Sequence, residues 1–340
     1  MAKSKEIGKV AIIGTGVIGA SWAALYLAHG LDVVATDIAP NAEAALRHFV
    51  DDAWPALTKF GLAVGASRDR LKFSADLDQA IEGADLVQEN GPEKPDFKIK
   101  LFADLDAKLP VTTILASSSS GIPMTVIQST CKNPDRCVVG HPFNPPHLMP
   151  LVEVVGGEKT SPHTIARTME FYASLGKKPI HIRKEMKGFV ANRLQAALWR
   201  EVFFLLSEGV ADVAAVDDAV SWGPGLRWGL MGPNMLAHLG GGQGGIQHAI
   251  DHLFAPMTTW WATSDPVLTP ELKKQIADGT LQLAANRSIE ELERERDTML
   301  LELLATRSKG EKVAQVAVAA AVGHSLEANE MRRTNWGPHA

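Results

Sequence analysis

In the first half of the chain, short and almost wholly apolar runs alternate with longer stretches whose apolar positions repeat at a helical period. Short apolar runs separated by helices are typical of the buried strands of a parallel sheet. The predicted strands are Val10–Ile13, Val33–Thr36, Leu86–Gln88, Thr113–Ala116, Val138–Gly140, Leu151–Val155 and Ile180–Arg183. Intervening helices are predicted at Asn41–Phe60, Phe97–Leu109 and Pro162–Leu175. This order of elements indicates βαβ units and a doubly wound α/β sheet.

After about Lys187 the strand signals stop and only helical periods remain. The helices predicted there are Phe189–Leu206, Val213–Trp222, Pro270–Ala277 and Ser288–Ala305. The last one opens with Ser288 and Glu291, the S-x-x-E capping box that satisfies free amide groups at a helix start. An all-α region therefore follows the sheet.

The change of pattern sets the predicted domains. We predict a sheet domain over residues 1–186 and an all-α domain over residues 187–323. Residues 324–340 lack periodicity and are expected to form a C-terminal tail. The apolar tract Val313–Gly323, at the end of the second domain, is expected to form a buried helix.

A glycine-rich turn joins the first predicted strand to a helix. It has the sequence Gly14-Thr-Gly16-Val17-Ile18-Gly19, the G-x-G-x-x-G pattern that binds a dinucleotide when it stands between a strand and a helix. The first glycine permits a tight turn, the second lets backbone amides approach a pyrophosphate, and the third lets helix and strand pack closely. We therefore expect a Rossmann-type domain in which Gly14, Gly16, Val17, Ile18 and Gly19 bind the cofactor.

The nature of the dinucleotide follows from the next strand, which Asp37 ends. A carboxylate there holds the ribose hydroxyls and repels a 2′-phosphate, and no arginine occurs before Arg47 after the turn, so NAD is predicted rather than NADP. A second G-x-G-x-x-G match, Gly240–Gly245, follows no predicted strand. We interpret that second match as a loop.

Composition and charge exclude several other classes. The 340 residues are 46% hydrophobic and 21% charged, as expected for a globular enzyme. The net charge of −5 gives no basic surface for a nucleic acid. No apolar run reaches the ~18 residues of a membrane span, and the basic N-terminus lacks the apolar core of a signal peptide.

The cysteines and histidines offer no metal site. Cys131 and Cys137 are the two cysteines, their spacing matches no zinc pattern, and free thiols indicate a reducing cytoplasm. His248 and His252 stand four residues apart on a predicted helix. Without a third ligand nearby, we interpret them as surface histidines and predict no metal.

Three polar features are predicted at the carboxyl edge of the sheet, where open α/β folds bind ligands. Ser117–Ser120 follows one strand, His141 ends another, and Glu153 lies on the strand after a proline-rich turn. Oxidising an alcohol requires hydride to leave carbon while a base takes the hydroxyl proton, and histidine suits that role near neutral pH. A carboxylate behind the ring fixes its tautomer. For each residue taken alone, a structural hydrogen bond is the alternative.

Asn192 adds a further polar group, on the helix predicted from near Gly188. It shares a helical face with apolar residues, namely Phe189, Ala196, Trp199 and Phe203. We expect this face to be buried, and a buried amide requires hydrogen-bond partners. The amide then either belongs to the site or caps another backbone segment.

Taken together, these motifs resemble the 3-hydroxyacyl-CoA dehydrogenase family across nearly the whole chain. The matching segments, in the family's order and spacing, are AIIGTGVIG, QENGPEKPDFK, ASSSSG, GHPFNPPHLMPLVEVVGG and KGFVANRL. The resemblance implies a Rossmann domain, a helical domain that forms a homodimer, NAD as cofactor and L-3-hydroxy substrates.

The same resemblance implies roles for individual residues. His141 is the base, Glu153 is its partner, and Ser120 and Asn192 donate hydrogen bonds to the substrate oxygen. The resemblance also implies that Glu93 and Lys98 stand at positions where the family contacts NAD, and Asn144 at a position where the family supports the site.

The second domain narrows the resemblance to a free-acid branch, which contains L-carnitine dehydrogenases and L-gulonate 3-dehydrogenase (lambda-crystallin). The similar segment is Gly225–Gly232, GLRWGLMG, and the similarity continues through GLDVV, AWPAL, LWRE, GGIQH and SIEELERERD. Asn192 departs from the carnitine enzymes, which carry aspartate there, and this argues against a cationic trimethylammonium substrate. Arg227 is expected either to pair with a substrate carboxylate or to form an interdomain or dimer salt bridge.

The second domain is also rich in tryptophan. Indole rings bind a quaternary ammonium by cation–π contacts, although tryptophans more often belong to a core or an interface. The five in question are Trp199, Trp222, Trp228, Trp260 and Trp261.

The function predicted is NAD-dependent oxidation of the 3-hydroxyl of a small L-3-hydroxy acid, as in L-carnitine dehydrogenases. The alternatives are L-gulonate 3-dehydrogenase and 3-hydroxybutyryl-CoA dehydrogenase. The CoA enzyme needs basic residues for the CoA phosphates, and Lys59, Arg68 and Arg70 are too few to decide. A structural, crystallin-like protein is an alternative of another class, which the retained polar residues disfavour.

Overall fold

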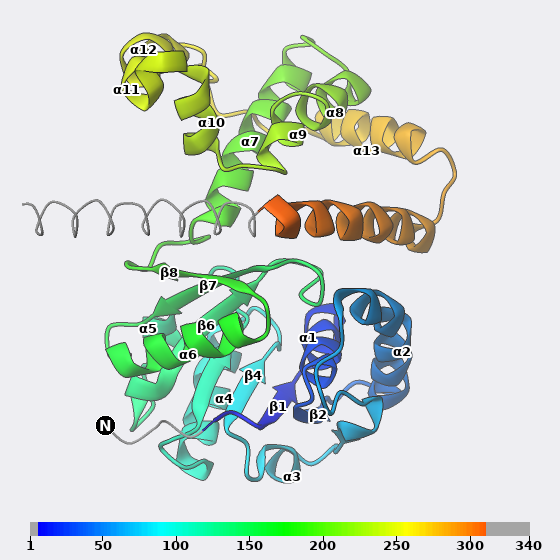
Figure 1. The fold of residues 1–340 in the computed structure, drawn as a ribbon, viewed down its shortest axis with the longest axis vertical. Coiled ribbons are helices and arrows are strands. Elements are labelled where there is room, and N and C mark those ends of the chain that lie inside the picture. Colours follow the sequence, from blue (N-terminus) through cyan, green and yellow to red (C-terminus); the bar gives the residue numbers. More distant parts are fainter. Residues whose placement is uncertain (1–5, 311–340) are drawn as a thin grey trace, which may run out of the picture. The chain divides into compact units, whose positions relative to one another are not determined.

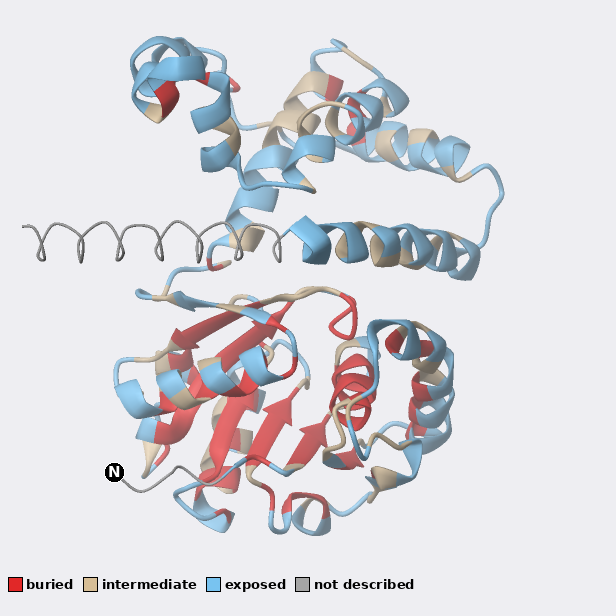
Figure 2. Cartoon of the chain, viewed as in Figure 1, coloured by how far each residue is buried: buried red, intermediate tan, exposed pale blue. Residues whose placement is uncertain are grey.

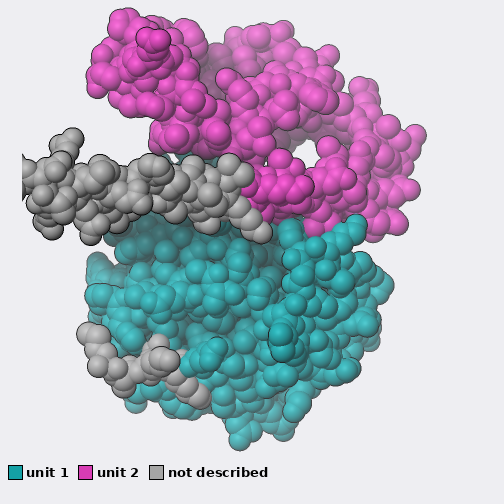
Figure 3. All heavy atoms as spheres, viewed as in Figure 1, with its two compact units in different colours: residues 1–197 teal, residues 198–340 magenta. Residues whose placement is uncertain are grey.

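The structure is a computed structural model that describes residues 6–310 of the 340-residue chain. The chain divides into two compact units, Met1–Ala197 and Leu198–Ala340 (Figure 3). The first unit is built on a β-sheet, whereas the described residues of the second form helices and loops without a strand. The predicted fold class, a Rossmann-type doubly wound sheet followed by an all-α region, is confirmed.

One eight-stranded sheet forms the centre of the first unit (Figure 1). The strands lie in the order β3-β2-β1-β4-β5-β6-β7-β8, and each neighbouring pair is parallel except β6 with β7. Their bounds are β1 Lys9–Ile13, β2 Asp32–Thr36, β3 Leu71–Phe73, β4 Leu86–Glu89, β5 Ile114–Ser117, β6 Cys137–Pro142, β7 Leu151–Gly156 and β8 Lys178–Ile182. All the predicted strands are present. Strand β3 was not predicted because its three residues are too short a run for a period to show.

Helices cover both faces of the sheet. Successive strand residues point to opposite faces, so Val10 and Ile12 of β1 belong to one buried cluster and Ala11 and Ile13 to another. The first cluster includes residues of α1 (Val17–Ala28), α2 (Ala42–Phe60) and α6 (Pro162–Ser174). The second includes residues of α3 (Leu77–Ile81), α4 (Pro95–Lys108) and α5 (Met124–Ile127). Burial of both faces explains why the strands are almost wholly apolar.

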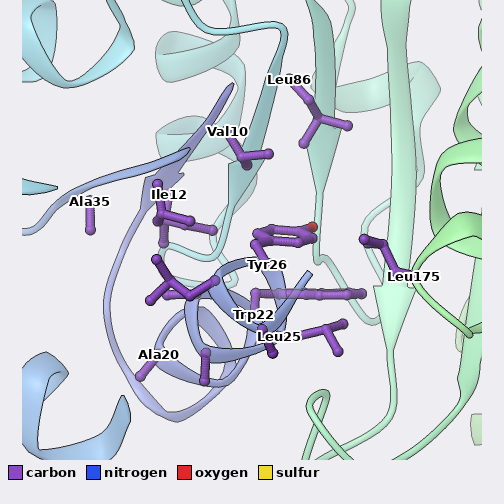
Figure 4. Packing of buried hydrophobic residues seen from close by; sticks show 14 of the residues in the cluster. Val10, Ile12, Ala20, Trp22, Leu25, Tyr26, Ala35, Leu86 and Leu175 are labelled. Atoms are coloured by element: carbon purple, nitrogen blue, oxygen red, sulfur yellow. The ribbon is translucent and has the colours of Figure 1, made fainter. Parts of the chain in front are cut away.

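Helix α1 supplies two of the largest buried side chains. Trp22 and Tyr26, one turn apart, stack at a ring-centroid distance of 5.3 Å and lie beside the strands that carry Ile12 and Leu86 (Figure 4). Both rings are fully buried. This packing fixes α1 against the sheet and holds its N-terminus at the carboxyl edge of β1, where the glycine turn lies.

Helix α7 (Ala191–Ser207) begins in the first unit, and the second unit starts within it, at Leu198. The further helical elements are α8 Val213–Ser221, α9 Pro224–Trp228, α10 Pro233–Gly240, α11 Gly245–Ala249, a π-helical turn Ile250–Phe254, α12 Ala255–Met257 and α13 Pro270–Ala284. Residues 289–310 are also helical. Apart from the helix expected around His248 and His252, the short elements between residues 224 and 257 were not predicted, because each is too short to show a helical period.

The predicted capping box is confirmed. The Ser288 N–H donates to Glu291 Oε2 at 2.8 Å, and the Glu291 N–H donates to Ser288 Oγ at 3.2 Å. The second glycine motif has no strand before it, as predicted, but the interpretation as a loop is wrong at its ends. Gly240 ends α10 and Gly245 begins α11, and a 3₁₀ turn joins them. The predicted helix 313–323 and the tail 324–340 lie outside the described residues.

Burial differs sharply between the units (Figure 2). Most strands of the first unit are buried, although the edge strands β3 and β8 are largely not. The buried cluster of the second unit contains only Leu206, Val216 and Leu272 among the described residues. So small a core leaves large apolar side chains exposed. The five tryptophans of interest are not core residues, because all are exposed, and their place in an interface stays a prediction: Trp199 45%, Trp222 75%, Trp228 44%, Trp260 70% and Trp261 64%.

Candidate active site

The glycine turn after β1 has the geometry that its sequence predicts. Gly14 has a φ of +84°, and a Cβ there would stand 2.8 Å from the carbonyl oxygen of Asn90. A Cβ on Gly19 would overlap the carbonyl oxygen of Gly14, so helix and turn approach closely. Around Gly16, the N-cap of α1, nothing lies within 4 Å of where a Cβ would stand. The turn therefore offers open space beside the helix N-terminus, where a pyrophosphate binds.

Asp37 follows β2 beside this turn. Its Oδ2 accepts hydrogen bonds from the Thr15 amide at 2.6 Å and the Thr15 hydroxyl at 3.0 Å, and its Oδ1 accepts one from the Ala39 amide at 2.9 Å. Partial burial by itself raises the pKa of Asp37, but these hydrogen bonds outweigh it and hold the pKa below its ordinary value. A stable carboxylate thus stands beside the first turn of α1, which carries Val17 and Ile18.

Lys98 of α4 lies in a buried ion pair that sequence reasoning missed. Its Nζ donates to both carboxylate oxygens of Glu89, at 2.7 and 2.8 Å, and both side chains are 1% exposed or less. Glu89 also accepts hydrogen bonds from the Ser117 hydroxyl and the Gly91 amide, each at 2.6 Å. A buried pair this fully bonded fixes the carboxyl ends of β4 and β5 together. The sequence feature that could have indicated a buried ion pair is the acidic Glu89, directly after the apolar predicted strand Leu86–Gln88.

Glu93 organises the serine-rich turn after β5. Its Oε1 accepts from the Ser119 hydroxyl at 2.7 Å and from the amides of Ser120 and Gly121, each at 3.0 Å. Burial raises the pKa of Glu93, but the Ser119 hydroxyl, the charge of Lys98 and the turn amides together lower it below the usual value. Ser119 therefore holds the turn, and Ser120 is exposed at its tip.

His141 and Glu153 form the central pair of the site. They are opposite each other in the antiparallel β6–β7 register, so their side chains stand on the same face of the sheet. The His141 Nδ1 lies 2.9 Å from Glu153 Oε2, and the two residues are 6% and 0% exposed. The rings of Phe143 and Phe189 lie 5.5 and 5.6 Å from the imidazole, measured between centroids. With Nδ1 engaged, Nε2 is the ring nitrogen left for chemistry.

The second oxygen of Glu153 is also engaged. Glu153 Oε1 accepts the amides of Val190 and Ala191, at 2.9 and 3.0 Å, at the N-terminus of α7. Burial raises the pKa of Glu153, but the hydrogen bonds from His141, Ala191 and Val190 outweigh it, so the pKa lies below its ordinary value. The carboxylate thus stays ionised, and the partial positive charge of the helix start stabilises it.

The amide of Asn192 follows these two residues on the first turn of α7 and is half-buried. The expectation that its whole helical face is buried is wrong. Ala196 and Trp199 are exposed, and Phe203 is half-buried. Phe203 packs against the small buried cluster of the second unit, whereas Ala196 and Trp199 do not belong to that cluster.

The proline-rich turn between β6 and β7 is fastened by a buried lysine that sequence reasoning also missed. Lys177 Nζ donates to the carbonyl oxygens of Pro146 and Met149, the latter at 2.9 Å. Burial lowers the pKa of Lys177 to about 7. Asn144, in the same turn, is exposed, and the peptide bond that follows it is cis.

The remaining predicted residues lie in other parts of the sequence. Arg227 is exposed on α9 in the second unit. His248 and His252 stack at a centroid distance of 4.3 Å. Within residues 6–310, no three His, Cys, Asp or Glu side chains are grouped as metal ligands require. The thiols of Cys131 and Cys137 are free and buried, with their sulfur atoms 4.0 Å apart.

A search of the described helices finds none with the length and apolar character needed to cross a membrane.

A Rossmann-type domain with a dinucleotide turn, an acidic residue after β2 and a histidine–carboxylate pair at the same edge defines a nicotinamide-dependent dehydrogenase. Two family models match the chain: 3-hydroxyacyl-CoA dehydrogenase, NAD binding domain, over residues 9–186, and 3-hydroxyacyl-CoA dehydrogenase, C-terminal domain, over residues 188–275. The chain belongs to the 3-hydroxyacyl-CoA dehydrogenase family, as its motifs predict. It is an NAD-dependent oxidoreductase, and the predicted cofactor is confirmed.

Individual relatives agree with this assignment. The chain is 47% identical to the L-carnitine dehydrogenase of Streptomyces griseus subsp. griseus over 88% of its own length and 90% of the relative's. It is 47% identical to the L-carnitine dehydrogenase of Pseudomonas putida, over 88% and 94% of the two chains. Among solved structures, an NAD-dependent 5-formyl-3-hydroxy-2-methylpyridine 4-carboxylic acid 5-dehydrogenase has a TM-score of 0.78 and 32% identity, over 89% of this chain and 99% of that one.

Proposed function

We propose that this protein oxidises the 3-hydroxyl of a small L-3-hydroxy acid, L-carnitine or a close analogue, with His141 as the general base. The observation that carries the proposal is the buried hydrogen bond between His141 Nδ1 and Glu153 Oε2, 2.9 Å long. Because the ionised carboxylate requires a donor at Nδ1, Nε2 carries the lone pair that takes a hydroxyl proton. Imidazolium formed in this way is stabilised by Glu153.

The remaining residues of the first unit divide between cofactor and substrate. The turn Gly14–Gly19 and the carboxylate of Asp37 hold NAD, which when bound accepts hydride from the alcohol carbon. Glu93 and Lys98 support that site through the serine turn and the buried pair with Glu89. Ser120 and Asn192 donate hydrogen bonds to the substrate oxygen, and Asn144 supports the turn beside His141.

In the second unit, we assign the carboxylate of the substrate to Arg227. A guanidinium binds a carboxylate with two parallel hydrogen bonds, and this side chain is exposed. The exposed tryptophans offer faces for a quaternary ammonium. This assignment is the reason to prefer a free acid over a CoA thioester.

We further propose residues 1–186 as the NAD-binding domain, residues 187–323 as the helical substrate and dimerisation domain and residues 324–340 as a tail. A cytoplasmic homodimer is supported by the free thiols and by the exposed apolar side chains of the second unit, such as Trp222 and Trp260. Sedimentation of the purified chain tests the dimer. A monomer at micromolar concentration would contradict it.

One substrate panel tests the central proposal. The purified full chain is assayed with NAD against L-carnitine, L-gulonate, L-3-hydroxybutyrate and L-3-hydroxybutyryl-CoA, following NADH absorbance. Preference for L-carnitine is expected from the relatives. That result would overturn the argument from Asn192 against a trimethylammonium substrate, whereas preference for an uncharged analogue would support it. Activity on the thioester alone would overturn the choice of a free acid, and inactivity on any hydroxy acid would favour a structural, crystallin-like role.

A variant identifies the base. His141→Ala is expected to bind NAD like the parent and to lose about two to four orders of magnitude in turnover. The matched control is His163→Ala, because His163 is exposed on α6 in the same unit. Retained turnover in His141→Ala would remove His141 from the role of base.

A further inference from the structure

The chain enters α7 through two consecutive residues in the left-handed region. Gly188 has a φ of +76° and Phe189 a φ of +47°. Glycine adopts this conformation readily, but a bulky residue with a Cβ does so only when its surroundings impose it. Among residues 6–310, the other non-glycine residues with positive φ are small or are asparagine: Asn41, Ala285 and Asn286. Phe189 therefore stands out as the large side chain held in this way.

The ring of Phe189 is fixed as firmly as its backbone. The residue is 2% exposed and belongs to the buried cluster on one face of the sheet. Its ring centroid lies 5.6 Å from that of His141, with an angle of 53° between the planes. The ring thus limits how far the imidazole can tilt.

The backbone of the same residue directs the next two amides. The Phe189 amide donates to the Met186 carbonyl at 3.0 Å, which closes the turn before the helix. The amides of the next two residues, Val190 and Ala191, then both donate to Glu153 Oε1, at 2.9 and 3.0 Å. An ordinary right-handed or extended conformation at this residue would send those amides elsewhere.

We infer that Phe189 is a positioning residue for the His141–Glu153 pair: its left-handed backbone directs two helix amides onto Glu153, and its ring holds the imidazole from the side. Phe189 acts on the base from two directions. With Oε1 held by the helix start, Glu153 cannot rotate, so Oε2 stays aligned with His141 Nδ1. With the ring in place, the imidazole cannot turn away from that oxygen. The inference rests on the proposed role of His141.

The inference predicts a spectroscopic signature in the imidazole. While Glu153 is fixed, neutral His141 keeps its proton on Nδ1. If Glu153 and the ring loosen, the proton distributes between Nδ1 and Nε2, and the Nε2–H form has no lone pair for the substrate proton. A purely structural role for Phe189 would lower stability without changing the tautomer.

The test variant is Phe189→Val, because a β-branched side chain opposes the left-handed conformation and also removes the ring. The matched control is Phe171→Leu. Phe171 is a buried phenylalanine, 7% exposed, in the cluster on the other face of the sheet, where its ring lies against Tyr172. If Phe189→Val does not fold, Phe189→Leu takes its place, since it removes the ring without adding a β-branch.

Two readouts are taken on the full chain. Nitrogen-15 NMR of histidine-labelled protein in alkaline buffer measures the tautomer of His141, assigned by loss of its signals in His141→Asn. In the parent, a single Nδ1–H tautomer is expected, and in Phe189→Val both tautomers are expected in comparable amounts. In parallel, kcat should fall about ten- to a hundredfold, as for a misplaced reacting group, while the KM for NAD changes less than twofold.

The outcomes separate the two proposals. If Phe189→Val keeps a single tautomer and full kcat while its Tm falls as in Phe171→Leu, Phe189 is only a core residue and the inference is overturned. If the parent oxidises no hydroxy acid but the variant mixes the tautomers, the proposed function fails and the positioning role stands. If Phe171→Leu mixes the tautomers as well, the effect is not specific to Phe189 and the inference fails.

Discussion

Replacing Glu153 with glutamine tests the chemistry of the site most directly, because it changes one oxygen to an amino group and little else. Glu153 is fully buried and accepts three hydrogen bonds: one from His141 on Oε2 and two, from Val190 and Ala191, on Oε1. A glutamine cannot accept at both ends. In either orientation of the glutamine amide, its NH₂ group faces a hydrogen-bond donor, either His141 or the two helix amides.

The lower-energy placement keeps the glutamine oxygen on the helix amides, because two donors face that side. The amino group then points at His141 Nδ1, which must become an acceptor, and the ring proton moves to Nε2. In that tautomer Nε2 has no lone pair for the substrate hydroxyl. We expect kcat to fall by about 10²–10⁴, equivalent to roughly 3 to 5 kcal/mol of transition-state stabilisation.

The assay measures kcat and KM for NAD and for the best substrate of the panel, with NAD affinity measured by titration. Because Glu153 does not belong to the glycine turn or the Asp37 side of the site, NAD affinity should stay within about twofold. Glu158→Gln is the matched control, since Glu158 is exposed just beyond β7. A loss of less than tenfold in Glu153→Gln, with the fold intact, would refute the reasoning about the tautomer.

Two further predictions concern the cofactor edge and the proline-rich turn. Asp37→Ala should weaken NAD binding about ten- to a hundredfold and NADP binding less, because a 2′-phosphate no longer meets a carboxylate. The control is Asp32→Ala, at the other end of β2. An unchanged ratio of NAD affinity to NADP affinity in titrations would contradict the ribose contact. For Lys177, the folded pKa of about 7 lies below the unfolded value of about 10.4. Between these values the unfolded chain holds one more proton, so the free energy of unfolding should rise with pH by about 1.4 kcal/mol per unit, while below pH 7 this contribution is constant. Lys177→Met should remove that slope in urea denaturation at several pH values, and parallel profiles for the two proteins would show that the ammonium is not desolvated.

The sequence by itself determined the features that depend on neighbouring residues. The periods of two and 3.6 predicted the strands and long helices, because burial imposes those periods locally. The glycine turn and Asp37 were identified because a dinucleotide turn needs particular residue types within one short segment. His141 was found as a candidate from its place at a strand end, and Glu153 from its place on the strand after the proline-rich turn.

Only the tertiary structure decided how these residues meet. The antiparallel register of β6 and β7 places Glu153 opposite His141, and a shift by one residue would point one side chain to the other face. The pairing of Glu89 with Lys98 and the left-handed conformation of Phe189 were likewise decided by the tertiary structure. Each depends on hydrogen bonds or packing between different elements of the fold. A local pattern records that a side chain is buried but not which partner meets it.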